Sequence, residues 1–166
     1  MPPLQVELIY VALLNVILIP ITHLVISYFT IKIPRSFFEK ERWWSKERAF
    51  EKGGTFYEKY FLIKVWKKYL PDGAKLFAGG FAKKHFKEFS IEYIDIFIAE
   101  TRRAEWSHYI QILPAALFYL FNPLWAAYVV TGYFILANLA PIVAQRHTRP
   151  RLIKLKLKAQ KKITSR

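Results

Sequence analysis

An uncharged run of 24 residues, from Leu8 to Ile31, contains no Lys, Arg, Asp or Glu. A helix needs about 20 apolar residues to cross the roughly 30 Å hydrocarbon core of a bilayer, so this run is long enough to span it. It is not a cleavable signal peptide, because no basic residue precedes it and no small-residue cleavage site follows it. The sequence therefore predicts a first transmembrane helix within residues 5–31, kinked at Pro20.

A second uncharged block covers the 37 residues from Tyr109 to Gln145. As one helix it would be about 55 Å long at 1.5 Å per residue, which is too long for one crossing. Pro123 disfavours helical backbone at Asn122, so a turn is expected there. The block is therefore predicted to be a helical hairpin with limbs 106–121 and 123–145. The first limb is short, and both a full crossing and a re-entrant segment remain open.

The basic residues predict the orientation. All 26 Lys and Arg lie in two stretches, with 17 between Lys32 and Arg103 and 9 between Arg146 and Arg166. Such segments stay on the cytoplasmic side of a membrane. The N-terminus and the turn at Asn122 should then face outward, and the C-terminus should lie in the cytoplasm.

The predicted fold is all-α: a polytopic protein of the cell membrane with about three transmembrane helices. Residues 1–166 form a single membrane domain. Residues 32–105 form a basic cytoplasmic segment with amphipathic, interfacial helices, and residues 146–166 form a basic cytoplasmic tail.

The net charge of +14 suits either nucleic acid or anionic lipid as a partner. Basic residues beside a membrane gain about 1 kcal/mol each from anionic headgroups. The apolar runs leave little soluble surface for nucleic acid, and the 14 Phe, 10 Tyr and 5 Trp suit the membrane interface. We expect anionic lipids and no nucleic acid. The absence of Cys excludes disulfides, thiolate catalysis and cysteine zinc sites.

The cytoplasmic segment has helical composition from Phe56 to Leu70, and turn signals at Gly53-Gly54, Pro71-Asp72-Gly73 and Gly79-Gly80. Neither glycine pair has the spacing or the trailing Lys-Ser/Thr of a phosphate-binding loop, so we interpret both as turns.

The stretch from Ile91 to Tyr109 has the periodicity of an amphipathic helix. Its apolar face carries Tyr93, Ile94, Phe97, Ile98 and Ala104, and its polar face carries Glu92, Asp95, Arg102 and Arg103. Thr101, Glu105 and His108 fall within the apolar face. Ionisable groups on a face expected to be buried need a partner, because an unpaired buried charge is costly.

Two hypotheses explain Glu105 and His108. In the functional one His108 is a general base, since imidazole gains and loses a proton near neutral pH, and Glu105 orients its ring. In the structural one they are a hydrogen-bonded pair where the helix enters the interface. A metal site based on Glu-x-x-His would need a second copy and further carboxylates, so we expect no metal.

An arginine cluster follows the second apolar block, with Arg146, Arg149 and Arg151. Guanidinium groups bind phosphate and carboxylate in a bidentate manner. Arginines are also common wherever a transmembrane helix reaches the cytoplasm, and both explanations stay open. Asn138 and Gln145 lie just before the cluster.

Several motifs together resemble the glycosyl-4,4'-diaponeurosporenoate acyltransferase family, over about Lys32 to Leu152. They are Lys32-Ile33-Pro34, Phe50-Glu51-Lys52, Glu100-Thr101-x-Arg103-Ala104-Glu105-x-x-His108, Ile112-Leu113-Pro114, Ala137-Asn138 and Gln145-Arg146-x-x-Arg149-Pro150-Arg151-Leu152. The resemblance implies transfer of a fatty acyl chain to a sugar hydroxyl of a glycosylated lipid or carotenoid. The orientation predicted from the basic residues places this reaction at the cytoplasmic leaflet.

On this hypothesis the catalytic residues are His108 and Glu105. The substrate-binding candidates are Glu100, Thr101, Arg103, Asn138, Gln145, Arg146, Arg149 and Arg151, of which Arg103, Arg146 and Arg149 would hold the anionic donor or stabilise the oxyanion. No cofactor is expected beyond the acyl donor as co-substrate. A non-catalytic lipid-binding or scaffold protein and, less favoured, a small membrane reductase or methyltransferase remain alternatives.

Overall fold

The computed structural model describes residues 4, 7–70 and 90–164. The regular elements in this part of the chain are all helical, as predicted. The long ones are α1 (Leu8–Lys32), α5 (Ile91–Ile112), which continues as the 3-10 helix η4 (Leu113–Leu120), and α6 (Leu124–Thr164). The short ones are α2 (Ser36–Glu39), η1 (Ala49–Gly54), α3 (Thr55–Phe61), α4 (Ile63–Trp66) and η2 (Lys67–Tyr69).

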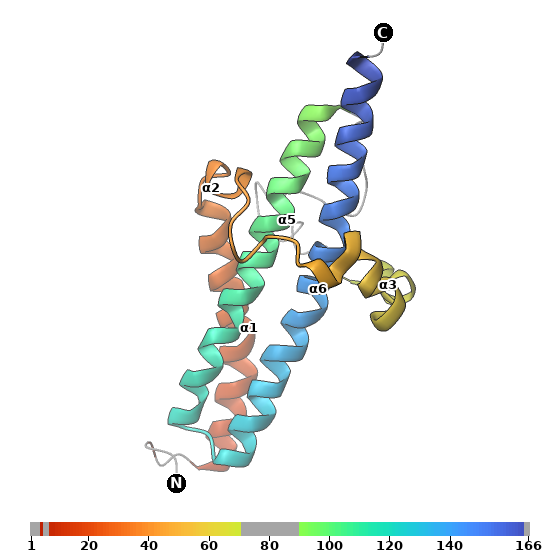
Figure 1. The fold of residues 1–166 in the computed structure, drawn as a ribbon. Helices are drawn as coiled ribbons and strands as arrows, with labels where there is room; N and C mark the ends of the chain where they lie inside the picture. Colours follow the sequence, from red (N-terminus) through yellow and green to blue (C-terminus); the bar gives the residue numbers. More distant parts are fainter. Residues whose placement is uncertain (1–3, 5–6, 71–89, 165–166) are drawn as a thin grey trace.

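The long helices form an elongated bundle (Figure 1). α5 and α6 run side by side, and α1 packs against the end of this pair that contains the chain turn. The other end of the pair extends beyond α1 towards the C-terminus, and α3 lies beside the middle of α6. Part of the segment between α1 and α5 therefore meets α6 near its middle.

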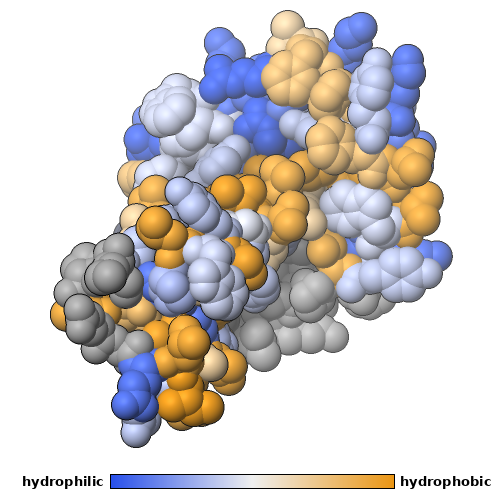
Figure 2. Space-filling model, turned by 90° about the horizontal axis from the view of Figure 1, so that it is seen from below, coloured by the Kyte–Doolittle hydropathy of each residue, from blue (hydrophilic) through white to orange (hydrophobic). Residues whose placement is uncertain are grey.

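Two helices, α1 and α6, are long and apolar enough to cross a membrane. α1 has Pro20 in its interior and most of its large apolar side chains are exposed. In Figure 2, which views the molecule from below, orange hydrophobic residues cover much of the face, with blue hydrophilic residues towards its margins. Exposed apolar surface on this scale is typical of contact with lipid or another partner.

The predicted turn at Asn122 is present, and it separates η4 from α6. The side chain of Asn122 is buried. Its Nδ2 donates to the Phe118 carbonyl at 2.9 Å, and its Oδ1 accepts a hydrogen bond from Nδ2 of Asn15 on α1 at 2.7 Å. The turn is thereby tied to α1. The first hairpin limb is not a separate helix, because it continues the helix that begins at Ile91.

α6 extends well beyond the predicted limb 123–145, because it continues through Pro141 and Pro150 to Thr164. Packing explains the extension. Leu152 on α6 packs with Ile94, Phe97 and Ile98 on the first turns of α5. The apolar face predicted for α5 is therefore covered by the segment that we expected to be a tail.

The cytoplasmic helix predicted over Phe56–Leu70 is broken at Leu62, which has a φ of 47°. This left-handed backbone separates α3 from α4. Gly53 and Gly54 also have positive φ, in agreement with the predicted turn. At Gly54 an added Cβ would lie 3.0 Å from the carbonyl oxygen of His147, so only glycine fits there. The other two turn signals lie outside the described residues.

The polar face predicted for the 91–109 helix is only partly exposed. Glu92 and Asp95 are exposed, but Arg102 is buried. Its Nη1 donates to the carbonyl oxygens of Phe38 at 3.1 Å and Glu39 at 2.6 Å. The prediction for Arg102 was wrong because α2 packs over this side of α5 and supplies the backbone acceptors.

Candidate active site

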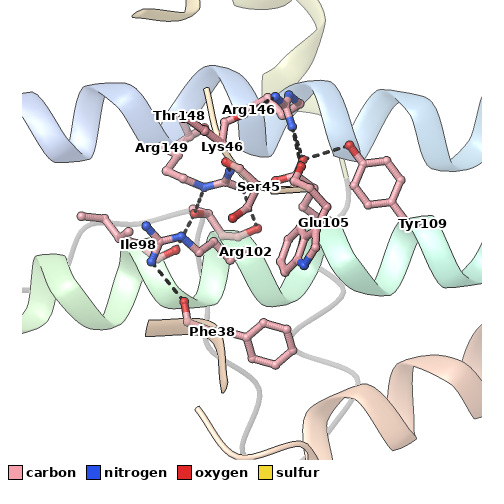
Figure 3. A network of polar contacts seen from close by, with 12 residues as sticks. Phe38, Ser45, Lys46, Ile98, Arg102, Glu105, Tyr109, Arg146, Thr148 and Arg149 are labelled. Atoms are coloured by element: carbon pink, nitrogen blue, oxygen red, sulfur yellow. Dashed lines mark hydrogen bonds and ion pairs between the residues drawn. The ribbon is translucent and has the colours of Figure 1, made fainter. Parts of the chain in front are cut away.

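Glu105 lies at the centre of a buried polar network between α5 and α6 (Figure 3). Its side chain is fully buried. Nη1 of Arg146 donates to Oε1 at 2.6 Å, and the Tyr109 hydroxyl donates to the same oxygen at 3.0 Å. Arg149 donates to Oε2. The predicted burial of Glu105 is confirmed, and two arginines from α6 provide its partners.

Arg146 connects Glu105 to residues 44–51, between α2 and α3. Nε donates to Oε1 of Glu51 at 2.5 Å. Nη1 also donates to the Trp44 carbonyl, and Nη2 to the Lys46 carbonyl, each at 3.0 Å. All three guanidinium nitrogens are therefore directed at acceptors within the protein.

Arg149 makes a similar set of contacts one turn along α6. Nε donates to the Thr101 hydroxyl at 3.1 Å, and Nη1 donates to the Ser45 carbonyl at 2.7 Å. Thr101 is itself fully buried, as predicted. Arg146 and Arg149 thus attach the loop of residues 44–46 to the two long helices.

Glu51, in η1, completes the network on the side away from α5. It is buried, and Oε1 also accepts a hydrogen bond from the Tyr57 hydroxyl at 2.6 Å. Burial alone would raise the pKa of Glu51, but hydrogen bonds from Arg146, from Tyr57 and from the backbone N–H of Arg48 together lower it below its usual value. Glu51 is therefore held as a carboxylate beside Arg146.

His108 belongs to a separate pair. Its Nδ1 lies 2.8 Å from Oδ1 of Asn138 on α6. Nδ2 of Asn138 donates to the backbone carbonyl of Phe134 at 2.8 Å, which places the amide oxygen towards the ring. Because that oxygen can only accept, Nδ1 of His108 must donate. In the neutral imidazole, Nε2 then carries the lone pair.

The structure therefore does not show the expected hydrogen bond between Glu105 and His108, because each side chain has partners on α6. Both oxygens of Glu105 receive hydrogen bonds from α6 arginines, and Tyr109 adds a third. Nδ1 of His108 faces Asn138, which lies on α6 eight residues, or about two turns, before Arg146. Asn138, and not Glu105, makes the contact that fixes the tautomer of the imidazole.

The remaining candidates lie at the edge of this network. Arg103 forms an ion pair with Glu100 at 3.3 Å and donates to the Ile33 carbonyl at 3.1 Å. Gln145 is half-buried. Arg151 is more exposed, and it contacts Glu58 and the carbonyl of His147. The structure thus joins Thr101, Glu105, Arg146 and Arg149, pairs His108 with Asn138, and leaves Arg151 apart.

Several members of the network were not predicted. Glu51 lies in a motif that contributes to the family resemblance, but its sequence position gives no sign that it meets Arg146. Tyr57 lies in the segment 56–70, whose apolar residues follow no single face. The acceptors at Trp44, Ser45 and Lys46 are backbone carbonyls, which side-chain patterns do not reveal.

Comparison with known proteins identifies the family. The sequence profile described as glycosyl-4,4'-diaponeurosporenoate acyltransferase matches residues 34–158. A protein of that name from a strain of Staphylococcus aureus is 36% identical over 135 residues, which cover 81% of each chain. Relatives of the same name from two other strains are each 34% identical, with the same coverage. The chain belongs to this family.

As a member of the glycosyl-4,4'-diaponeurosporenoate acyltransferase family, the protein is an acyltransferase. The resemblance described from its motifs is confirmed. The profile match contains the whole Glu105 network and the His108–Asn138 pair, whereas α1 lies before it. No solved structure matches the chain.

Proposed function

We propose that this acyltransferase moves a fatty acyl chain onto a sugar hydroxyl of a glycosylated carotenoid or lipid, at the cytoplasmic leaflet of the cell membrane. The name of the relatives supports a glycosylated carotenoid as the acceptor. The observation that carries the proposed chemistry is the hydrogen bond between Asn138 and His108, because it leaves Nε2 of the imidazole as the basic nitrogen.

His108 acts as the general base in this mechanism. Nε2 takes the proton of the sugar hydroxyl while the hydroxyl oxygen forms a bond to the carbonyl carbon of the donor. The tetrahedral intermediate then breaks its bond to the leaving group, which takes the proton from the imidazolium. One ester bond forms, one donor acyl bond breaks, and the imidazole returns to its neutral form.

The depth of His108 fits a reaction at the membrane interface. Arg103 donates to the carbonyl of Ile33, so this point of α5 is level with the end of α1. His108 follows five residues later on α5, about 7 Å deeper at 1.5 Å per residue. A lipid-like glycoside anchored by its chain would present its sugar at about this level.

The proposed topology has three crossings: α1, the last part of α5 together with η4, and the first part of α6. Lys32 and the arginines that follow Gln145 then lie on the cytoplasmic side, in agreement with the positive-inside rule. The N-terminus and the turn at Asn122 face outward.

Arg146 and Arg149 have a positioning role in this account. Their N–H groups are directed at Glu51, Glu105, Thr101 and loop carbonyls, so they hold the loop and both helices around the site. A better candidate for the anionic part of the donor is the surface near Glu58, which three cationic side chains approach. Lys64 and Arg151 pair with Glu58, and Lys67 donates to Thr148 on the next turn of α6.

Two cations paired with one carboxylate, together with Lys67 at Thr148, leave an excess of positive charge. Such an excess suits the phosphate of an acyl donor or the headgroup of an anionic lipid. Lys67 adds to this argument. It is partly buried, which lowers its pKa, and a nearby anion would offset the cost of burying its charge.

The proposed function is tested with purified full-length protein in lipid nanodiscs and glycosyl-4,4'-diaponeurosporenoate as the acceptor. Acyl-CoA, an acyl carrier protein thioester and a phospholipid are offered separately as donors. We expect a product one fatty acyl group heavier than the glycoside with at least one donor, and no product from the aglycone. Equal acylation of the aglycone, or no product with any donor, would contradict the proposal.

A further inference from the structure

A second histidine, His23 on α1, faces the interior of the bundle that α1 forms with α5 and α6. Its Nδ1 lies 3.0 Å from Oε1 of Gln111, one turn after His108 on α5. Its ring stacks on Phe134 with 5.0 Å between centroids, and Phe134 supplies the carbonyl that orients Asn138. His23 precedes the residues that match the family profile.

The neighbours of Gln111 fix the tautomer of His23. Nε2 of Gln111 donates to the Ser27 hydroxyl at 2.8 Å, and it also lies 3.5 Å from the backbone carbonyl of His23. The amide oxygen of Gln111 therefore faces the imidazole, and Nδ1 of His23 must donate to it. The lone pair of the neutral ring is then at Nε2, as in His108.

Nε2 of His23 is buried and has no hydrogen-bond partner among the residues that the structure describes. A buried acceptor without a donor loses the hydrogen bond that it would make in water, so the site favours a ligand that brings a donor. A hydroxyl group satisfies Nε2, whereas an ester or ketone carbonyl does not.

The side chains around His23 indicate the chemical class of the ligand. An amide (Gln111), two hydroxyls (Ser27 and Ser107) and the rings of Phe134 and Tyr133 lie around or beside the imidazole. Hydroxyl and amide groups next to aromatic faces can contact both the polar edge and the apolar face of a sugar. Gln111 follows His108 by three residues, which is about 5 Å along α5 at 1.5 Å per residue. His23, which contacts Gln111, therefore lies about 5 Å deeper in the bundle than His108.

We propose that Nε2 of His23 accepts a hydrogen bond from a second hydroxyl of the acceptor's sugar, and so holds the glycoside with its reactive hydroxyl at His108. His23 is then a substrate-binding residue on α1 that selects the glycosylated acceptor. This inference rests on the proposed function, because it assumes that the acceptor is a glycoside.

Two substitutions separate binding from a purely structural role. Asn in place of His23 keeps a donor near the position of Nδ1, and with it the contact to Gln111, but has no group at Nε2. Gln in place of His23 reaches the position of Nε2 with an amide oxygen but gives up the Nδ1 donor. A substrate-binding role predicts that His23→Asn is the weaker variant, and a structural role predicts the reverse.

The experiment measures equilibrium binding of the coloured glycoside to the full-length protein, from its absorbance, with the aglycone as the control ligand. We expect His23→Asn to raise the Kd for glycosyl-4,4'-diaponeurosporenoate about tenfold and His23→Gln to stay within about threefold of wild type. Binding of the aglycone should be the same for all three proteins. An unchanged Kd in His23→Asn, a weaker His23→Gln, or an equal effect on the aglycone would overturn the proposal.

Turnover of the wild-type protein, measured in parallel, tests the proposed function by itself. Acyl transfer with an unchanged Kd in His23→Asn removes the role of His23 and leaves the proposed function standing. Binding that depends on His23 without acyl transfer to the glycoside contradicts the proposed function and leaves His23 as part of a sugar site.

Discussion

Glu105 on α5 and Arg146 on α6 form a buried ion pair with 2.6 Å between Oε1 and Nη1. The same arginine contacts Glu51 in η1 at 2.5 Å, so one guanidinium joins two helices of the bundle to η1. Neither carboxylate is accessible to water. The pair therefore fixes how α5 and α6 pack one turn before His108 on α5.

Replacing Glu105 with Gln should destabilise the protein strongly, because Arg146 and Arg149 lose their shared carboxylate while remaining buried. Breaking a buried ion pair by removing one partner costs about 3 to 5 kcal/mol. Denaturant unfolding in detergent measures the change. The control is Glu92→Gln on the exposed side of α5, which should change stability by less than about 1 kcal/mol. Equal stability of the two variants would contradict the role given to Glu105.

The stability of the protein should fall in acid partly through Glu51. Its pKa is lowered in the folded state, so its contribution is complete above the ordinary carboxyl value of 4.5 and is lost as the pH falls through the folded-state value. Glu51→Gln cannot titrate, and the difference in stability between wild type and this variant should shrink below pH 4.5. Thermal unfolding from pH 7 down to pH 3 measures it. A difference that does not depend on pH would contradict the ionised pair.

Replacing Asn138 with Ala should lower kcat, since the imidazole of His108 loses the acceptor that fixes its tautomer. The loss of one such hydrogen bond predicts a decrease of about tenfold. KM for the acceptor should change little. Thr131→Val, which removes a hydroxyl bonded to the Ala127 carbonyl on the same helix, serves as the control. A raised KM with an unchanged kcat would show that Asn138 binds substrate and does not orient His108.

The proposed topology can be tested by labelling introduced cysteines. The chain has no Cys of its own, so it gives no background labelling. Leu124→Cys, at the exposed start of α6, should react with a membrane-impermeant maleimide added to intact cells. Thr164→Cys, at the end of α6, should react only after the cells are permeabilised. The reverse pattern would place the charged segments outside.

The features predicted correctly from the sequence are those that local patterns determine. The turn at Asn122 follows from the proline after it, and the burial of Thr101 and Glu105 follows from their register on an amphipathic helix. These inferences need only the 3.6-residue period and the restriction that proline places on its neighbour.

The partners of Glu105 could not be derived in this way. Arg146 and Arg149 are over 40 positions away from it in sequence, and only the antiparallel pairing of α5 with an uninterrupted α6 brings them together. The second limb was predicted to end at Gln145, because the uncharged block ends there. Arg102 was assigned to solvent because its acceptors are backbone carbonyls of α2, which side-chain patterns do not reveal.

The most direct test of the account is kcat for His108→Gln, with the glycoside and the effective donor both saturating. Loss of a general base predicts a decrease of about 100- to 10,000-fold. Glycoside binding should be unchanged, and stability should fall by no more than about 3 kcal/mol, from the lost hydrogen bond to Asn138. The matched control, His147→Gln, alters a histidine on the far side of the Glu105 network that contacts Glu58, and it should keep kcat within about threefold of wild type. A kcat for His108→Gln close to that of wild type would contradict the assignment of His108 as the base.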